Sequence, residues 1–109
     1  MIFSRHMIVA VAASLACTVS LAQVDEGIRK KAEETCGSCH GPGGAKPAMP
    51  ETPKLAGQQY EYLIHSLKAF RDGTRESPLM GAMAKPLSDA DIISLSRYYS
   101  SQSGLRTRY

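Results

Sequence analysis

The run Cys36-Gly37-Ser38-Cys39-His40 constrains this chain more than any other part of its sequence. On a helical turn, positions i, i+3 and i+4 share one face, so both thiols and the imidazole can point at a single flat ligand. The C-x-x-C-H spacing is the attachment signature of a c-type haem. We therefore expect Cys36 and Cys39 to form thioethers with the haem vinyl groups and His40 to bind the iron as the proximal axial ligand.

Other uses of a C-x-x-C pair agree less well with the rest of the sequence. A thioredoxin-like redox pair needs a βαβ context, and this chain has almost no strand-like alternation. A zinc site needs further ligands, but residues 23–109 hold no second Cys pair, and His65 is their only other histidine. A disulfide between Cys36 and Cys39 would leave His40 without a purpose. The sequence thus predicts one covalently attached haem c as the cofactor.

The N-terminal residues have the pattern of a secretory signal peptide. Arg5 precedes an apolar run of thirteen residues, Met7 to Val19, and small residues precede an expected cut after Ala22. The run is shorter than the ~20 residues that a membrane-spanning helix needs. We therefore expect residues 1–22 to be a signal peptide and residues 23–109 to be a periplasmic domain with no stable membrane insertion after cleavage.

Cysteine usage agrees with export. Cys17 leaves with the signal peptide, and the haem takes the two remaining cysteines. Two alternatives stay open: the segment could be retained as an uncleaved membrane anchor, or Cys17 could be acylated as in a lipoprotein.

The expected mature chain has 87 residues, which indicates one domain with a small core. A covalently held haem would supply an apolar centre around which short helices can pack. Without Arg5, the expected mature chain carries 12 Lys and Arg against 10 Asp and Glu, a net charge of +2, and no clustered basic stripe. Nucleic acid is therefore not an expected partner.

Apolar spacing and end signals predict three helices, and hence an all-α fold. The first runs from Asp25 to Thr35 and leads directly into the Cys36 turn; the second runs from Gln58 to Asp72; the third is capped by Ser88 and runs to about Ser101. The proline-containing segments Gly41–Gly57 and Gly73–Leu87 are expected to be irregular. Residues 105–109 are expected to be a frayed tail.

An iron bound by His40 needs a sixth ligand or an open position. A Met thioether gives an electron-transfer centre with a raised potential, whereas an open position allows ligand binding. The candidates are Met49, His65, Met80 and Met83. Met49 follows His40 closely, and His65 looks like a surface residue of the second helix. Spacing alone does not separate Met80 from Met83.

Three segments, Cys36–Gly41, Pro53–Gln58 and Leu87–Asp89, resemble the class I c-type cytochromes. The likeness runs over nearly all of residues 25–102. It is closest to small periplasmic monohaem cytochromes and to single halves of the dihaem kind. It implies three main helices packed around one haem. It also implies that Met80, seven residues before Leu87, is the ligand, whereas Met83 matches a packing position.

The resemblance also implies that the carbonyl of Pro53 accepts a hydrogen bond from the Nδ1–H of His40, so that Nε2 binds iron. One departure concerns the crossing of the first and last helices. The family often has a glycine there, whereas this chain has Ile28, with Gly27 adjacent.

These features predict a periplasmic electron carrier that exchanges one electron with redox partner proteins and is not itself an enzyme. An alternative is the cytochrome subunit of an oxidoreductase complex, for example a flavocytochrome-type dehydrogenase. A third is a haem enzyme or gas sensor with a weak sixth ligand. Five basic residues could frame a docking face for an acidic partner or could simply be solvated charges; they are Lys46, Lys54, Arg71, Arg75 and Lys85.

Overall fold

The computed structural model describes residues 24–104, and every regular element within that range is helical. In chain order the elements are α1 (Glu26–Lys30), a π-helical stretch (Lys31–Cys36), α2 (Gly37–His40), a short 3-10 helix (Pro42–Gly44), α3 (Tyr60–Asp72), α4 (Pro78–Ala84) and α5 (Asp89–Ser100). The predicted all-α fold is confirmed. The expected signal peptide, Cys17 and the tail of residues 105–109 lie outside the described range.

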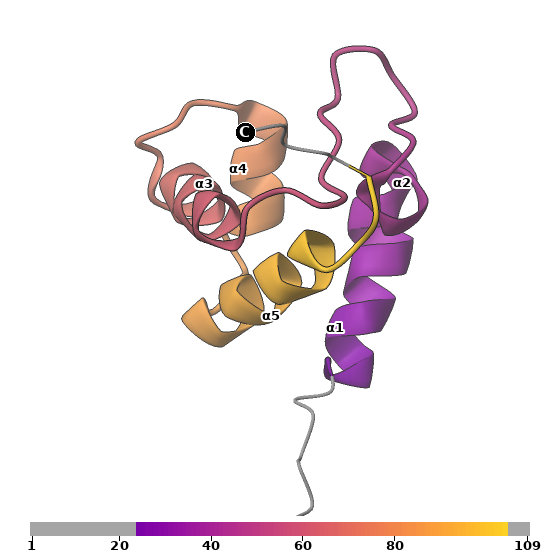
Figure 1. Ribbon diagram of the computed structural model, residues 1–109. Coiled ribbons are helices and arrows are strands. Elements are labelled where there is room, and N and C mark those ends of the chain that lie inside the picture. The colour runs from indigo at the N-terminus through magenta and orange to yellow at the C-terminus, as the bar shows by residue number, and fades with distance from the viewer. Residues whose placement is uncertain (1–23, 105–109) are drawn as a thin grey trace, which may run out of the picture.

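One continuous helix carries the C-x-x-C-H run. Asp25 caps it by accepting a hydrogen bond from the Gly27 N–H at 2.7 Å, and α1, the π-helical stretch and α2 then follow without a break (Figure 1). Gly41, with φ at 82°, ends it, because few residues with a side chain adopt that conformation. The predicted first helix therefore extends five residues beyond Thr35, as far as His40.

The π-helical stretch keeps four equally spaced residues on one face. Ile28, Ala32 and His40 are buried and Cys36 is half-buried, each four positions from the next. In an α-helix of 3.6 residues per turn, every fourth position drifts by about 40°. The N–H of Gly37 bonds the carbonyl of Ala32, an i→i+5 contact that takes more residues per turn and opposes this drift.

Helix α5 packs against both α1 and α3 (Figure 1). Ile92 and Leu95 are fully buried, and they join a core that also contains Ile28, Ala32, Leu63, Ala84, Leu87 and Tyr99. The helix begins with a capping box between Ser88 and Asp91, close to what the sequence predicts. Ile28, which stands where the family often has a glycine, is buried in the core, and α1 still contacts α5.

The prediction that segment 73–87 is irregular is wrong for its centre, where α4 forms. Ser77 caps α4 by accepting a hydrogen bond from the Met80 N–H at 3.2 Å. Pro78 lies in the first turn, where a missing N–H costs nothing, and Pro86 lies beyond the last turn. The two prolines therefore bracket a helix instead of preventing one.

Segment 41–57 is irregular as predicted, except for the 3-10 helix. Its backbone folds back on the haem-binding run, because the Ala48 N–H donates to the carbonyl of Cys39 at 2.8 Å. Its far end is fastened to α5 by the Gly57 N–H, which donates to the carbonyl of Tyr99 at 2.9 Å. Within residues 24–104, no helix has both the length and the apolar character to cross a bilayer.

Candidate haem site

His40 is held in one orientation. Its side chain is 7% exposed, and its Nδ1 lies 2.7 Å from the carbonyl oxygen of Pro53. A proline carbonyl can only accept a hydrogen bond, so Nδ1 carries the proton and donates it. The remaining nitrogen, Nε2, keeps its lone pair for a metal. This contact confirms the hydrogen bond implied by the resemblance.

Cys36 and Cys39 are half-buried, and no disulfide joins them. Burial raises the pKa of the Cys36 thiol, and the neighbouring Tyr99 hydroxyl and the charge of Lys31 offset this only in part. Until it reacts with the haem, the Cys36 thiol is therefore neutral at neutral pH. What suits Cys36 to haem attachment is its position, one helical turn before Cys39 and four residues before His40.

The candidates for the sixth ligand lie on three different elements. Met80 is half-buried on α4, and Met83, on the same helix, is 44% exposed. Met49, also 44% exposed, lies on the proline-rich segment, and His65 is exposed on α3. The exposure of His65 agrees with its interpretation as a surface residue. That Met80 binds iron stays a prediction.

Helix α4, which carries Met80, packs against α3. Gly81 faces α3, since a Cβ at its position would be in van der Waals contact, at 3.7 Å, with the carbonyl oxygen of Phe70. Ala84 is fully buried at the other end of α4. These contacts place α4, which includes Met80, against α3.

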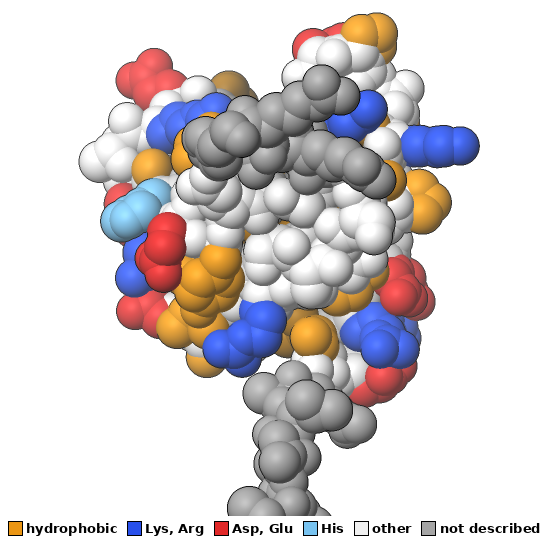
Figure 2. All heavy atoms as spheres, in the orientation of Figure 1, with side chains coloured by type: hydrophobic (Ala, Val, Ile, Leu, Met, Phe, Trp, Pro, Cys, Tyr) orange, Lys and Arg blue, Asp and Glu red, His pale blue; other side chains and the backbone are white. Residues whose placement is uncertain are grey.

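Two basic residues expected at a docking face have partners within the protein. Arg71 forms an ion pair with Asp89, and the guanidinium of Arg75 lies 4.6 Å from the centre of the Phe70 ring. Figure 2 shows Lys and Arg side chains interspersed with Asp and Glu on the face in view. Arg71 and Arg75 are thus structural residues first, a role that no local sequence pattern indicates.

The donor set agrees with a haem c. Two thiols at i and i+3 and an imidazole at i+4 come from one helical face, and the imidazole presents Nε2 while the protein holds Nδ1. Cys36, Cys39 and His40 are the residues that would hold the group.

Comparisons with known proteins point the same way. The family described as Cytochrome c matches residues 25–103. Cytochrome c-554(548) of Halomonas halodenitrificans is 49% identical over 71 residues, covering 62% of this chain and 84% of that protein. Cytochrome c4 of Pseudomonas aeruginosa is 42% identical over 67 residues, covering 62% of this chain and 33% of that protein.

A protein named thiosulfate dehydrogenase electron acceptor, from Thiomonas intermedia, is 44% identical over 66 residues. That match covers 61% of this chain but 30% of the relative. The chain therefore spans about a third of the length of several relatives that it matches. A solved structure of Acidithiobacillus ferrooxidans cytochrome c4 aligns with a TM-score of 0.57 and 39% identity, covering 61% of this chain and 38% of that one.

The family match covers well over half of the chain and includes the whole C-x-x-C-H run. The helical fold and the fixed imidazole agree with it. The protein is therefore an electron-transfer haem protein of the cytochrome c family, with a covalently bound haem c.

Proposed function

We propose that this protein is a periplasmic electron carrier whose iron is bound by His40 and Met80 and which shuttles one electron between redox partner proteins. The observation that supports the proposal is the 2.7 Å contact between His40 Nδ1 and the Pro53 carbonyl, which leaves Nε2 free to bind the iron. When bound, the haem supplies a one-electron ferrous/ferric couple.

The chain's own residues set the properties of that couple. The thioether of Met80 is a soft, neutral donor that favours ferrous iron and so raises the reduction potential. His40 and Met80 would together hold the iron and would leave it no position for a substrate. This supports a carrier rather than an enzyme.

A second candidate is a cytochrome that works with a dehydrogenase, as an electron-accepting partner or subunit. The similarity to a thiosulfate dehydrogenase electron acceptor favours it. Under this candidate the haem site is the same and the difference lies in a stable complex. Co-purification of a dehydrogenase in constant stoichiometry would support it over a freely diffusing carrier.

The test is expression of the full chain in a bacterium that attaches haem c, followed by fractionation and redox titration. We expect a periplasmic protein that begins at Gln23, carries one haem, titrates as a one-electron couple and does not bind carbon monoxide when reduced. Carbon monoxide binding by the reduced protein would contradict the Met80 ligand. An acylated Cys17 in the membrane fraction would contradict the soluble carrier.

A further inference from the structure

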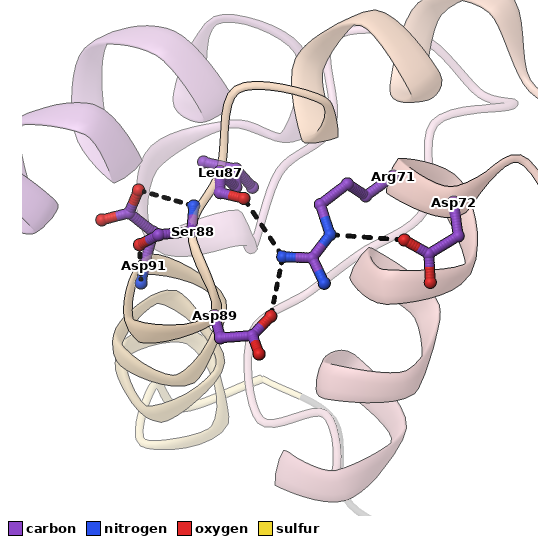
Figure 3. Close-up of polar contacts among 6 residues, drawn as sticks. All are labelled: Arg71, Asp72, Leu87, Ser88, Asp89 and Asp91. Carbon is purple, nitrogen blue, oxygen red and sulfur yellow. Dashed lines mark hydrogen bonds and ion pairs between the residues drawn. The ribbon is translucent and has the colours of Figure 1, made fainter.

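The segment that carries Met80 leaves α3 and returns to α5, and Arg71 bridges its two ends. The Nη1 group of Arg71 donates to the carbonyl of Leu87 at 3.2 Å and lies 2.8 Å from Oδ1 of Asp89 (Figure 3). Its Nε lies 3.4 Å from the carboxylate of the adjacent Asp72. One guanidinium on the last turn of α3 thus holds both the end of segment 73–87 and the first residue of α5.

The partners of Arg71 are themselves fixed. Leu87 is 8% exposed, and its N–H donates to the carbonyl of Ala84 at the end of α4. Ser88, the next residue, is locked by the capping box with Asp91, also visible in Figure 3. The carboxylate of Asp89 lies in the first turn of α5, where the helix dipole favours a negative charge. The carbonyl and carboxylate that Arg71 binds are therefore presented in a set geometry.

The start of the segment is fastened locally to α3. The Gly73 N–H donates to the carbonyl of Phe70, and the Arg75 N–H donates to the carbonyl of Ala69 at 3.1 Å. The hydroxyl of Thr74 reaches the same Ala69 carbonyl at 3.3 Å. These bonds turn the chain away from α3, but they do not bind the far end. The bonds of Arg71 join that end to α3.

We propose that Arg71 is a positioning residue for Met80, because its bonds to Leu87 and Asp89 hold segment 73–87 closed and so hold α4 in place. This rests on the proposed ligand role of Met80. A thioether is a weak ligand, so the entropy that segment 73–87 loses when Met80 binds is a large part of the binding free energy. Tying the ends together removes part of that freedom in advance.

The test measures how well free imidazole competes with Met80 for the sixth position of the ferric holoprotein. The apparent affinity of a competitor rises in proportion to the fraction of molecules in which Met80 is released. We expect Arg71→Gln to raise the apparent affinity for imidazole by about three- to tenfold, as expected for the loss of one hydrogen bond to the buried Leu87 and one ion pair with the exposed Asp89.

Matched variants separate the contacts. Asp89→Asn removes the ion pair but leaves the bond to the Leu87 carbonyl, so its effect should be smaller than that of Arg71→Gln. Asp72→Asn makes the same charge change at a contact that does not reach the far end, so imidazole affinity should stay at the wild-type value. Arg71→Lys keeps the positive charge but lacks the planar guanidinium that donates to two partners. It replaces Arg71→Gln in the test if that variant does not accumulate.

A second readout distinguishes positioning from general stability. Hydrogen exchange of the α4 amides should accelerate in Arg71→Gln more than that of the α1 and α5 amides. Uniform acceleration with unchanged imidazole affinity would show a merely structural role and overturn the proposal. A wild-type ferric protein without the red Met–iron band would instead overturn the ligand assignment and the positioning role together. A normal wild-type band with no effect of Arg71→Gln would overturn the positioning role alone.

Discussion

At the scale of single residues, two polar side chains are held by specific hydrogen bonds to distant parts of the chain. The Pro53 carbonyl accepts a hydrogen bond from the Nδ1–H of His40, which leaves Nε2 free to bind a metal. Arg71 donates to the Leu87 carbonyl and pairs with the Asp89 carboxylate, and so joins α3 to the start of α5. Both are contacts between positions more than ten residues apart in the sequence.

The ion pair of Arg71 predicts how Asp89 titrates. The Arg71 guanidinium, with a smaller contribution from Lys68, lowers the pKa of the Asp89 carboxyl below its usual value. A carboxyl whose pKa is lower when folded stabilises the fold above its unfolded pKa of about 3.9. That contribution is lost as the pH falls through the folded pKa. Titration of the Asp89 carboxyl carbon by NMR in the ferrous protein should show a lower midpoint in wild type than in Arg71→Gln; equal midpoints would contradict the pair.

At the scale of elements, local patterns predict the three main helices because each has its own cap and apolar spacing. Asp25, Gly73 and the Ser88–Asp91 box mark ends that the structure confirms. Helix α4 could not be read in this way, since prolines near both of its ends look like breakers until Ser77 is seen as the cap. The π-helical stretch is bound to α5 by the hydrogen bond between the Tyr99 hydroxyl and the Ala32 carbonyl, a long-range contact that no local pattern contains.

Tyr99 joins α5 to the π-helical stretch and gives a prediction for that packing. Its hydroxyl donates to the Ala32 carbonyl at 3.0 Å, and its side chain is 4% exposed. Tyr99→Phe should therefore lower the free energy of unfolding of the holoprotein by about 0.5–1.5 kcal/mol. Urea unfolding followed by haem absorbance measures it.

Tyr98→Phe is the matched control for that prediction. The two rings are neighbours, 5.0 Å apart between centroids, but the Tyr98 side chain is only half-buried. Its change should leave the unfolding free energy within about 0.5 kcal/mol of wild type. Equal losses in the two variants would show that the Ala32 bond does not stabilise the crossing.

At the scale of the whole molecule, short helices surround a small core and leave large apolar side chains exposed, among them Met49, Tyr62, Leu79, Met83 and Ile93. The family pattern predicted this architecture because the C-x-x-C-H run and the two later motifs have a fixed order along the chain. It could not predict which charges would have partners within the protein, as Arg71 has in Asp89 and Arg75 has in the Phe70 ring.

Removing both thioether positions should expose how much the fold depends on its cofactor. Cys36→Ser with Cys39→Ser should leave no haem after acid–acetone extraction, and Cys36→Ser alone should leave at most one thioether. The doubly substituted chain should lose helicity at a lower temperature than the holoprotein, because a chain this small buries little apolar surface by itself. Circular dichroism against temperature checks this, and equal midpoints would show that the protein core alone stabilises the fold.

The central claim, a carrier with His40 and Met80 on the iron, is tested most directly by the ferric absorption spectra of two variants on the same helix. Met80→Ala should abolish the Met–iron band at the red end of the spectrum, let the reduced protein bind carbon monoxide and lower the potential by on the order of a hundred millivolts, since axial ligands tune haems over ~0.8 V. Met83→Ala should keep the band. Loss of the band in Met83→Ala but not in Met80→Ala, or in neither variant, would contradict the account.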